Sequence, residues 1–305
     1  MTRLGALALA AGLLTTAACG SGSDSALGRR PTAYPAAGSN SASAAGPGIE
    51  SELVTRATTA VEAALSYDHA TYAADTAAAE ALMTRTFAAS WERIAERLRP
   101  HSDERHARAT ARVVDAGVTG ATSRAAQVLL LIDRSVHSSE GAQTSGGYAV
   151  ATLRHGRSGW LLAGLGLTPP RRQVTEQRPV PATVLAAATA VADAYADINS
   201  AHPHADIARL LSLTSGAFHR DYERASPELV ERVVASRAVQ DGVVVSAGLS
   251  SLKGAHARVV AVVTTVLRIP GQSPEHRILR LDLDLVRTPT AWLARGIRLV
   301  PDAGA

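Results

Sequence analysis

The sequence predicts an α+β protein with two tandem rolls, each made of helices packed on one face of a curved antiparallel sheet. Two observations lead to this prediction. In each half of the chain, segments with apolar residues at helical spacing come first, and β-branched or alternating segments follow. Distinctive residues of the first half also recur about 131 positions later in the second half.

The N-terminus has the pattern of a signal peptide. Residues 1–18 combine Arg3 with an apolar run from Leu4 to Ala18, which is too short to span a bilayer. The run ends in LTTAACG, which resembles a bacterial lipobox. The resemblance implies that the thiolate of Cys19, the single cysteine of the chain, accepts a diacylglyceryl group and anchors the protein in the cell membrane. The alternative is ordinary secretion with an unmodified Cys19.

Two further segments lack any apolar period. Residues 19–50 are rich in Gly, Ser, Ala and Pro, a composition typical of a disordered, flexible tether. Residues 169–182 are rich in Pro, which predicts a stiff, non-helical linker. These segments delimit two folded units, residues 51–168 and 183–301.

The two units are expected to be copies of one domain. The chain has two Phe residues, and each is followed four positions later by another aromatic residue; Trp160 is matched in the same way by a Trp in the second unit. We expect these residues to be largely buried in the core, and the alternative is that they line an apolar ligand pocket. They are Phe87, Trp91, Trp160, Phe218, Tyr222 and Trp292.

Helices are expected first in each unit. Apolar spacing predicts a first helix over 54–67 and 183–198, then a second helical stretch that reaches Leu82 and Leu211. A third helix is predicted from about Phe87 to Arg99, with Pro100 as its end. In the second unit, Ser226-Pro227 predicts that a helix starts anew.

Four strands are expected after the helices of each unit. They are bounded by Gly, Ser or Pro and carry β-branched or alternating residues. The predicted ranges are 112–118, 128–136, 147–154 and 160–167 in the first unit, and 243–249, 259–267, 277–287 and 292–300 in the second.

This order of elements, the Phe-x-x-x-Trp/Tyr motif, the Gly-Val strand and the closing Gly-Trp-Leu strand together resemble the nuclear transport factor 2-like fold. More narrowly, they are similar to the Mce-associated proteins of actinobacterial envelopes. The resemblance covers residues 53–167 and 183–301. It implies an accessory role beside an Mce-type lipid transport system and supplies no catalytic residues. Members usually carry one transmembrane helix and one such domain, whereas this chain has a lipobox and two.

The strongest candidate for enzyme chemistry is the strand around Asp282. Alternation places Arg280, Asp282 and Asp284 on one face, where two carboxylates could hold a proton or a cation. The other interpretation, which we favour, is that these residues form the solvated face of a half-buried strand whose Leu face points inward. Asp133, beside Arg134, is expected to form an ion pair at a strand edge or across strands.

Other motifs and the composition exclude several function classes. The ten histidines lack metal-ligand spacing, and the sequence has no nucleophile elbow or Walker A loop, so we expect no metal, no cofactor and no catalytic residue. The hydrophobic share of 46% fits a chain with a core, and one cysteine excludes a disulfide framework. A net charge of +4 is weak support for nucleic-acid binding, and none is expected.

The expected function is a non-catalytic lipoprotein on the extracytoplasmic face of the cell membrane. It would act as an accessory or binding module, with the membrane, envelope proteins and an apolar ligand as its partners. The alternative is a small-molecule enzyme, or a carrier of an apolar ligand, that uses the conical pocket of the roll.

Overall fold

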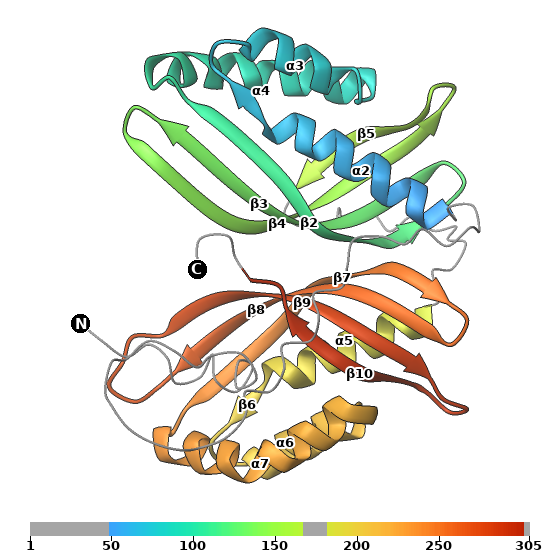
Figure 1. The fold of residues 1–305 in the computed structure, drawn as a ribbon, viewed down its shortest axis with the longest axis vertical. Helices are drawn as coiled ribbons and strands as arrows, with labels where there is room; N and C mark the ends of the chain where they lie inside the picture. The colour runs from blue at the N-terminus through green and yellow to red at the C-terminus, as the bar shows by residue number, and fades with distance from the viewer. Residues whose placement is uncertain (1–48, 167–181, 302–305) are drawn as a thin grey trace, which may run out of the picture.

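The computed structural model describes residues 49–166 and 182–301 (Figure 1). Cys19 and nearly all of the predicted tether lie outside the described residues, as does the Pro-rich linker except Ala182. The predicted α+β class is confirmed: each half packs helices on one face of a curved antiparallel sheet.

In the first half, three helices precede a meander of four strands. The elements are α2 (Ile49–Leu65), β1 (Tyr67–Asp68), α3 (Tyr72–Glu80), α4 (Arg85–Glu104), β2 (Arg108–Ala121), β3 (Ala125–Ser138), β4 (Gly141–Gly156) and β5 (Gly159–Gly166). Strands β2 to β5 pair with their sequence neighbours, and all pairs are antiparallel.

The second half has the same succession of elements. They are α5 (Ala182–Ala196), β6 (Ile198–Asn199), α6 (Pro203–Ser212), α7 (Gly216–Ser236), β7 (Val239–Lys253), β8 (His256–Arg268), β9 (Glu275–Arg287) and β10 (Trp292–Leu299). Strands β7 to β10 again form an antiparallel meander.

The strand registers also agree between the halves. Gly117 of β2 lies opposite Leu129 of β3, and Gly248 of β7 lies opposite Val260 of β8. β-Bulges, which bend a strand and increase its twist, fall at matching places on either side of these glycines. They lie between Val113/Asp115 and Val118/Gly120 in β2, and between Val244/Ser246 and Leu249/Ser251 in β7. The sheets therefore bend at the same positions.

Two predicted helix boundaries are wrong. Helix α4 continues through Pro100 to Glu104, and α7 continues through Pro227 instead of starting there. Both prolines are exposed. Water can therefore hydrogen-bond the carbonyl that each proline, having no N–H, leaves without a partner in the preceding turn, so the helix need not end.

The inner face of each sheet is apolar and packs against its own helices. In the first half, Val128, Leu130 and Ile132 of β3 face α2, and in the second half Val259 and Val263 of β8 face α5. Figure 1 shows the two sheets in the middle of the molecule, with α3 and α4 at one end and α6 and α7 at the opposite end.

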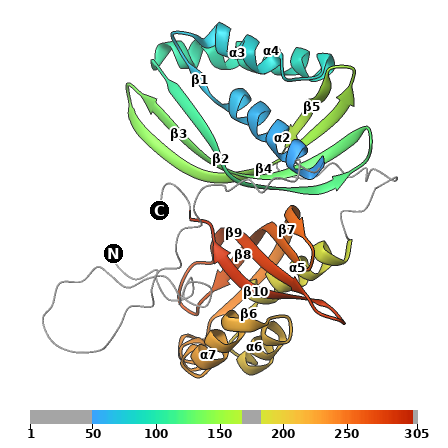
Figure 2. The same cartoon turned by 45° about the vertical axis from the view of Figure 1, so that its right-hand side comes forward.

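The outer faces of the two sheets pack back to back. A hydrophobic cluster between them contains Leu129 and Leu131 of β3, Val150 of β4, and Val260 and Val262 of β8, each at most 2% exposed. Figure 2 shows the two sheets adjoining from a second direction. The central part of the face of each sheet that points away from the helices is thus also buried.

At the centre of this junction the edge strands β2 and β7 meet at two glycines. Val118 pairs with Leu249, which joins the two meanders into one continuous sheet. A Cβ atom added at Gly117 would lie 2.2 Å from the carbonyl oxygen of Gly248, and one added at Gly248 would lie 2.3 Å from that of Gly117. Only glycine permits such a close approach of two backbones. This explains why the two half-sequences have glycine at matching positions.

Candidate functional site

The strand that carries Asp282 alternates as predicted, but its polar face is not solvated. Leu281, Leu283 and Leu285 of β9 pack against the helix side of the second half. On the opposite face, Arg280 is 2% exposed and Asp282 is 5% exposed. The predicted solvated face is therefore wrong for these two residues, because the sheet of the first half covers it.

Arg280 links the second half to the first. Its Nη1 donates to Asp133 Oδ1 at 2.7 Å and to the carbonyl oxygen of Ile132 at 3.3 Å. Its Nε donates to the carbonyl oxygen of Val300 at 3.4 Å. Asp133 forms an ion pair, as expected, but the partner belongs to the other half rather than to a neighbouring strand of its own sheet.

A second set of charges crosses the same junction. Arg258 of β8 donates to both carboxylate oxygens of Asp282, at 2.8 and 2.7 Å, and its Nη2 lies 3.0 Å from Asp115 Oδ2 in β2. Arg298 also donates to Asp282. We call Asp115, Arg258, Asp282 and Arg298, together with the Arg280–Asp133 pair, the junction network. Two arginines thus neutralise the buried carboxylate of Asp282.

Burial and charge act in opposite directions at Asp115. Burial raises the pKa of this carboxyl above its ordinary value, and the nearby Arg258 offsets part of that rise. The hydrogen bond to Asp282 raises the pKa of Arg258, which keeps the guanidinium charged. Asp284, by contrast, is half exposed and pairs with Arg295 at 2.8 Å. The carboxylates considered from the sequence as acids or bases are therefore all in ion pairs with arginine.

The sequence did not single out Asp115, Arg258 or Arg298. Asp115 lies within a β-bulge, where alternation does not indicate the face that a side chain takes. Arg258 could have been found, because it alternates with Val259 and Ala261 in a buried strand and is therefore on the same face as Val260 and Val262.

The six aromatic residues pack against the cores rather than around a common cavity. Trp160 and Phe218 are buried, at 5% and 8% exposure. The other four, Phe87, Trp91, Tyr222 and Trp292, are partly buried and pack against the hydrophobic clusters of their own half.

Each motif on the last helix forms a ring pair. The Phe87 and Trp91 ring centroids are 6.3 Å apart, and those of Phe218 and Tyr222 are 5.8 Å apart. Burial raises the pKa of Tyr222 to about 12, with a smaller contribution from Asp206, so its phenol stays neutral.

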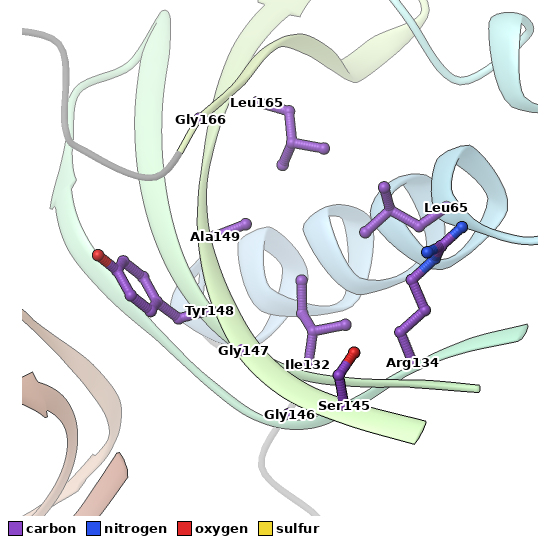
Figure 3. Close-up of a pocket in the computed structure, with 10 residues that line it drawn as sticks. All are labelled: Leu65, Ile132, Arg134, Ser145, Gly146, Gly147, Tyr148, Ala149, Leu165 and Gly166. Carbon is purple, nitrogen blue, oxygen red and sulfur yellow. The ribbon is translucent and has the colours of Figure 1, made fainter. Parts of the chain in front are cut away.

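A cavity of about 280 Å³ lies at the open end of the first roll, between the end of α2 and the sheet (Figure 3). Its apolar wall is formed by Leu65, Ile132, Ala149 and Leu165, whereas Arg134 and Ser145 lie at its rim. Gly147 leaves room on this wall, because a Cβ atom added there would have no heavy atom within 4 Å. None of the six aromatic residues lines this cavity.

Arg134 is the only charged residue among those that line the cavity. Its guanidinium carbon lies 5.9 Å from the centre of the Tyr67 ring, a cation–π distance. Within residues 49–166 and 182–301, no carboxylate lies at ion-pair distance from Arg134. The lining residues include no Asp, Glu, His or Cys, and this cavity offers an apolar wall and a cation.

The matched region of the second half is built differently. Because β3 and β8 share their register with the preceding strand, the pair Ile132–Gly147 corresponds to Val263–Leu279. Leu279 packs against the core of the second half at the position where Gly147 leaves open space. Likewise, Arg134 opposite Ser145 corresponds to Thr265 opposite Arg277.

Arg277, unlike Arg134, has an acidic partner, because it forms an ion pair with Glu275. The described part of the chain has no group of three or more His, Cys, Asp or Glu side chains that could hold a metal ion. It also has no helix that is long and apolar enough to cross a membrane.

The chain matches no protein family profile and no curated protein. Solved structures do match. An IcmL-like type IV secretion system protein from Legionella pneumophila is 16% identical, with a TM-score of 0.36, over 41% of this chain and 95% of its own. VirB8 from Agrobacterium tumefaciens is 8% identical, with a TM-score of 0.34, over 45% of this chain and 99% of its own.

An Ntf2-like protein involved in plasmid conjugation is 7% identical, with a TM-score of 0.28, and covers 83% of this chain and 97% of its own. At such identities the likeness concerns the fold alone. Since every one of these TM-scores is below 0.5, the fold described above rests on the element order and strand pairing of this chain.

Proposed function

We propose that this chain is a non-catalytic lipoprotein of the cell envelope, held on the extracytoplasmic face of the membrane by an acylated Cys19. Its two halves, in our proposal copies of one domain, act together as a rigid body that binds other envelope components. The narrower proposal is that these components belong to an Mce-type lipid transport system. That narrower step rests on the sequence resemblance of both halves to Mce-associated proteins.

The observation that supports a non-catalytic body is the junction network. Asp133 pairs with Arg280 across the two halves, and Asp282, a candidate for acid–base work, pairs within the second half with Arg258, which also contacts Asp115 of the first half. Asp133 and Asp282 alternate with Ile132 and with Leu281 and Leu283, which pack against the helix side of their sheets, and therefore lie on the outer faces. Their carboxylate oxygens therefore accept hydrogen bonds from arginines at the junction rather than facing a ligand cavity.

Complementation of a deletion strain tests this proposal. If the carboxylates are structural, then Asp133→Asn and Asp284→Asn proteins that are folded and correctly located should restore the wild-type phenotype. Cys19→Ala should fail to restore it, since nothing else would hold the body at the membrane. A folded, correctly located Asp133→Asn protein that behaves like the deletion would contradict the proposal and favour an enzyme.

A second candidate function is a carrier of a small apolar ligand. The observation that favours it is the cavity beside Gly147, which the matching Leu279 of the second half does not leave open. This function is compatible with the first, because a tethered binding body can also carry a ligand.

A further inference from the structure

We propose that the cavity at the open end of the first roll binds a free single-chain carboxylate, with the carboxylate on Arg134 and the hydrocarbon chain against the apolar wall. This inference rests on the proposed binding function and names the chemical class of the ligand. It assigns the site to the first half of the chain only.

The wall of the cavity suits a hydrocarbon chain. Leu65 at the end of α2, Ile132 on β3 and Leu165 on β5 project into the same space from three sides (Figure 3). Gly147 and Ala149 on β4 line the part of the cavity next to Ile132, where their small size leaves space. Burial of apolar ligand surface against such a wall is favourable, by about 0.8 kcal/mol per methylene.

The rim suits an anionic head group. Arg134 carries a full charge, and its interaction within the described residues is with the Tyr67 ring, which leaves its charge uncompensated by any carboxylate there. The guanidinium presents a planar fork of N–H donors that matches a carboxylate. The hydroxyl of Ser145, directly opposite Arg134 in the sheet, adds a further donor at the same rim.

The size of the cavity limits the length of the ligand. Its volume of about 280 Å³ is near the lower end of ligand pockets. At about 30 Å³ for each non-hydrogen atom, the share of a water molecule in the liquid, it holds roughly nine such atoms. A chain of about eight carbons fits with its carboxylate at the rim, whereas a chain of sixteen carbons would extend into solvent.

The second half supplies the residues for matched substitutions. At the positions of Gly147 and Ala149 it has Leu279 and Leu281, and at the position of Arg134 it has Thr265. Gly147→Leu therefore fills the cavity, and Arg134→Thr removes the cation, each with a residue that this fold already accommodates at the matched site. Arg154→Thr is the control, because Arg154 is exposed on β4 and does not line the cavity.

The experiment is a titration of the full-length, detergent-solubilised protein with octanoate, octanol and octylamine, monitored by calorimetry and by the carboxyl signal of ¹³C-labelled octanoate. We expect saturable binding of one octanoate per chain, at least tenfold tighter than octanol, since hydrogen bonds to charged groups contribute about 1.5–3 kcal/mol. Octylamine should bind more weakly than octanol, because its ammonium would face Arg134.

The variants separate the two parts of the proposal. Arg134→Thr should weaken octanoate binding about tenfold or more and leave octanol binding unchanged. Gly147→Leu should weaken both, and Arg154→Thr should change neither. If Gly147→Leu does not fold, Ala149→Leu fills the same wall. Equal binding of octanoate and octanol, or equal effects of Arg134→Thr and Arg154→Thr, would overturn the carboxylate assignment.

Absence of octanoate binding to the wild-type chain would overturn the ligand class and leave the proposed function standing. That function is tested by the complementation of Asp133→Asn and Cys19→Ala, and neither residue lines the cavity. The two results can therefore fail separately.

Discussion

The two halves of this chain have the same backbone plan, yet their side chains differ on both faces of the sheet. On the outer face, both halves contribute apolar residues, but the three arginines of the junction network all come from the second half, whereas the first half contributes two of its carboxylates, Asp115 and Asp133. On the inner face, the first half has Gly147 beside a cavity, and the second half has Leu279 in its core. Backbone features recur, whereas the charged groups of the junction and the open cavity do not.

The two halves, although they share one succession of elements, contribute different groups to the junction and to the cavity. The glycines of β2 and β7 serve both halves equally, because each allows the other backbone to approach. The arginines of the junction come from the second half, and the open cavity belongs to the first. Substitutions at matching positions should therefore have unequal effects, except at the two glycines.

The largest effect is expected from Gly117→Ala. Its Cβ would lie 2.2 Å from the Gly248 carbonyl oxygen, so the two backbones must separate. We expect a loss of about 3 kcal/mol in the free energy of unfolding, measured by urea denaturation. Gly248→Ala should cost a similar amount, while Gly156→Ala, which meets no heavy atom within 4 Å, should cost little. A mild effect of both junction substitutions would show that the close approach is not needed.

The next largest effect is expected from Arg280→Met. The substitution leaves Asp133 without the partner that lies 2.7 Å away and removes a donor from the Ile132 carbonyl. Because Asp133 retains some exposure to water, we expect the free energy of unfolding to fall by about 2–3 kcal/mol. This is at or below the lower limit for removing one partner of a buried ion pair. Arg295→Met, which removes the exposed partner of Asp284, should cost less than about 1 kcal/mol. Equal losses would contradict the burial of the junction network.

Prediction from the sequence was limited at this junction. Alternation correctly placed Arg280 and Asp282 on one face and the leucines on the other, and it predicted the leucine face as the inner one. It could not show that the polar face is covered, because the covering sheet comes from residues about 150 positions away in the chain.

The cavity also could not be predicted from the pattern of apolar residues in the sequence. The third strand of the first unit was predicted to begin at residue 147, whereas β4 begins at Gly141, and Gly147 lies within it and leaves room beside Ile132. The recurring aromatic residues were expected in the core, with a pocket lining as the alternative, and Phe87, Trp91, Tyr222 and Trp292 do pack against the hydrophobic clusters. A glycine contributes no side chain to the apolar pattern, so a single sequence does not show that it faces a cavity.

A smaller, pH-dependent effect is expected at Asp115. Its pKa is raised in the folded protein by burial, so the folded state binds this proton more tightly than the unfolded state does. As the pH falls through the window between the raised pKa and the ordinary value of 3.8, the wild type should gain stability relative to Asp115→Asn. Urea denaturation of both proteins between pH 7 and pH 4 measures this difference.

Asp68 provides the control of opposite sign. A hydrogen bond from the Ala70 N–H, followed by Arg108, lowers its pKa, so the contribution of Asp68 is lost as the pH falls from the ordinary value of 3.8 through the lowered pKa, and the wild type and Asp68→Asn are therefore compared below pH 3.8. Relative to Asp68→Asn, the wild type should therefore lose stability in acid. If the wild type also loses stability in acid relative to Asp115→Asn, then burial is not the dominant cause of the pKa shift at Asp115.

The smallest effect is expected from Asp284→Asn. Asp284 is half exposed, and its ion pair with Arg295 is exposed to solvent. The free energy of unfolding should therefore change by no more than about 0.5 kcal/mol. Asp282→Asn, only two residues away on the same face, should be clearly more destabilising, because Asp282 accepts hydrogen bonds from two arginines in a buried site. Similar values for the two variants would mean that the sheets do not cover Asp282.

The measurement that tests the account most directly asks whether the two halves unfold together. Trp91 and Trp160 report on the first half and Trp292 on the second, so Trp292→Phe and the double variant Trp91→Phe/Trp160→Phe each leave probes in one half. In urea, the fluorescence of each variant should follow its far-UV circular dichroism in one cooperative transition. Introducing Gly117→Ala should separate the transitions of the two halves. Two separate transitions without that substitution would contradict a single body joined at the junction network.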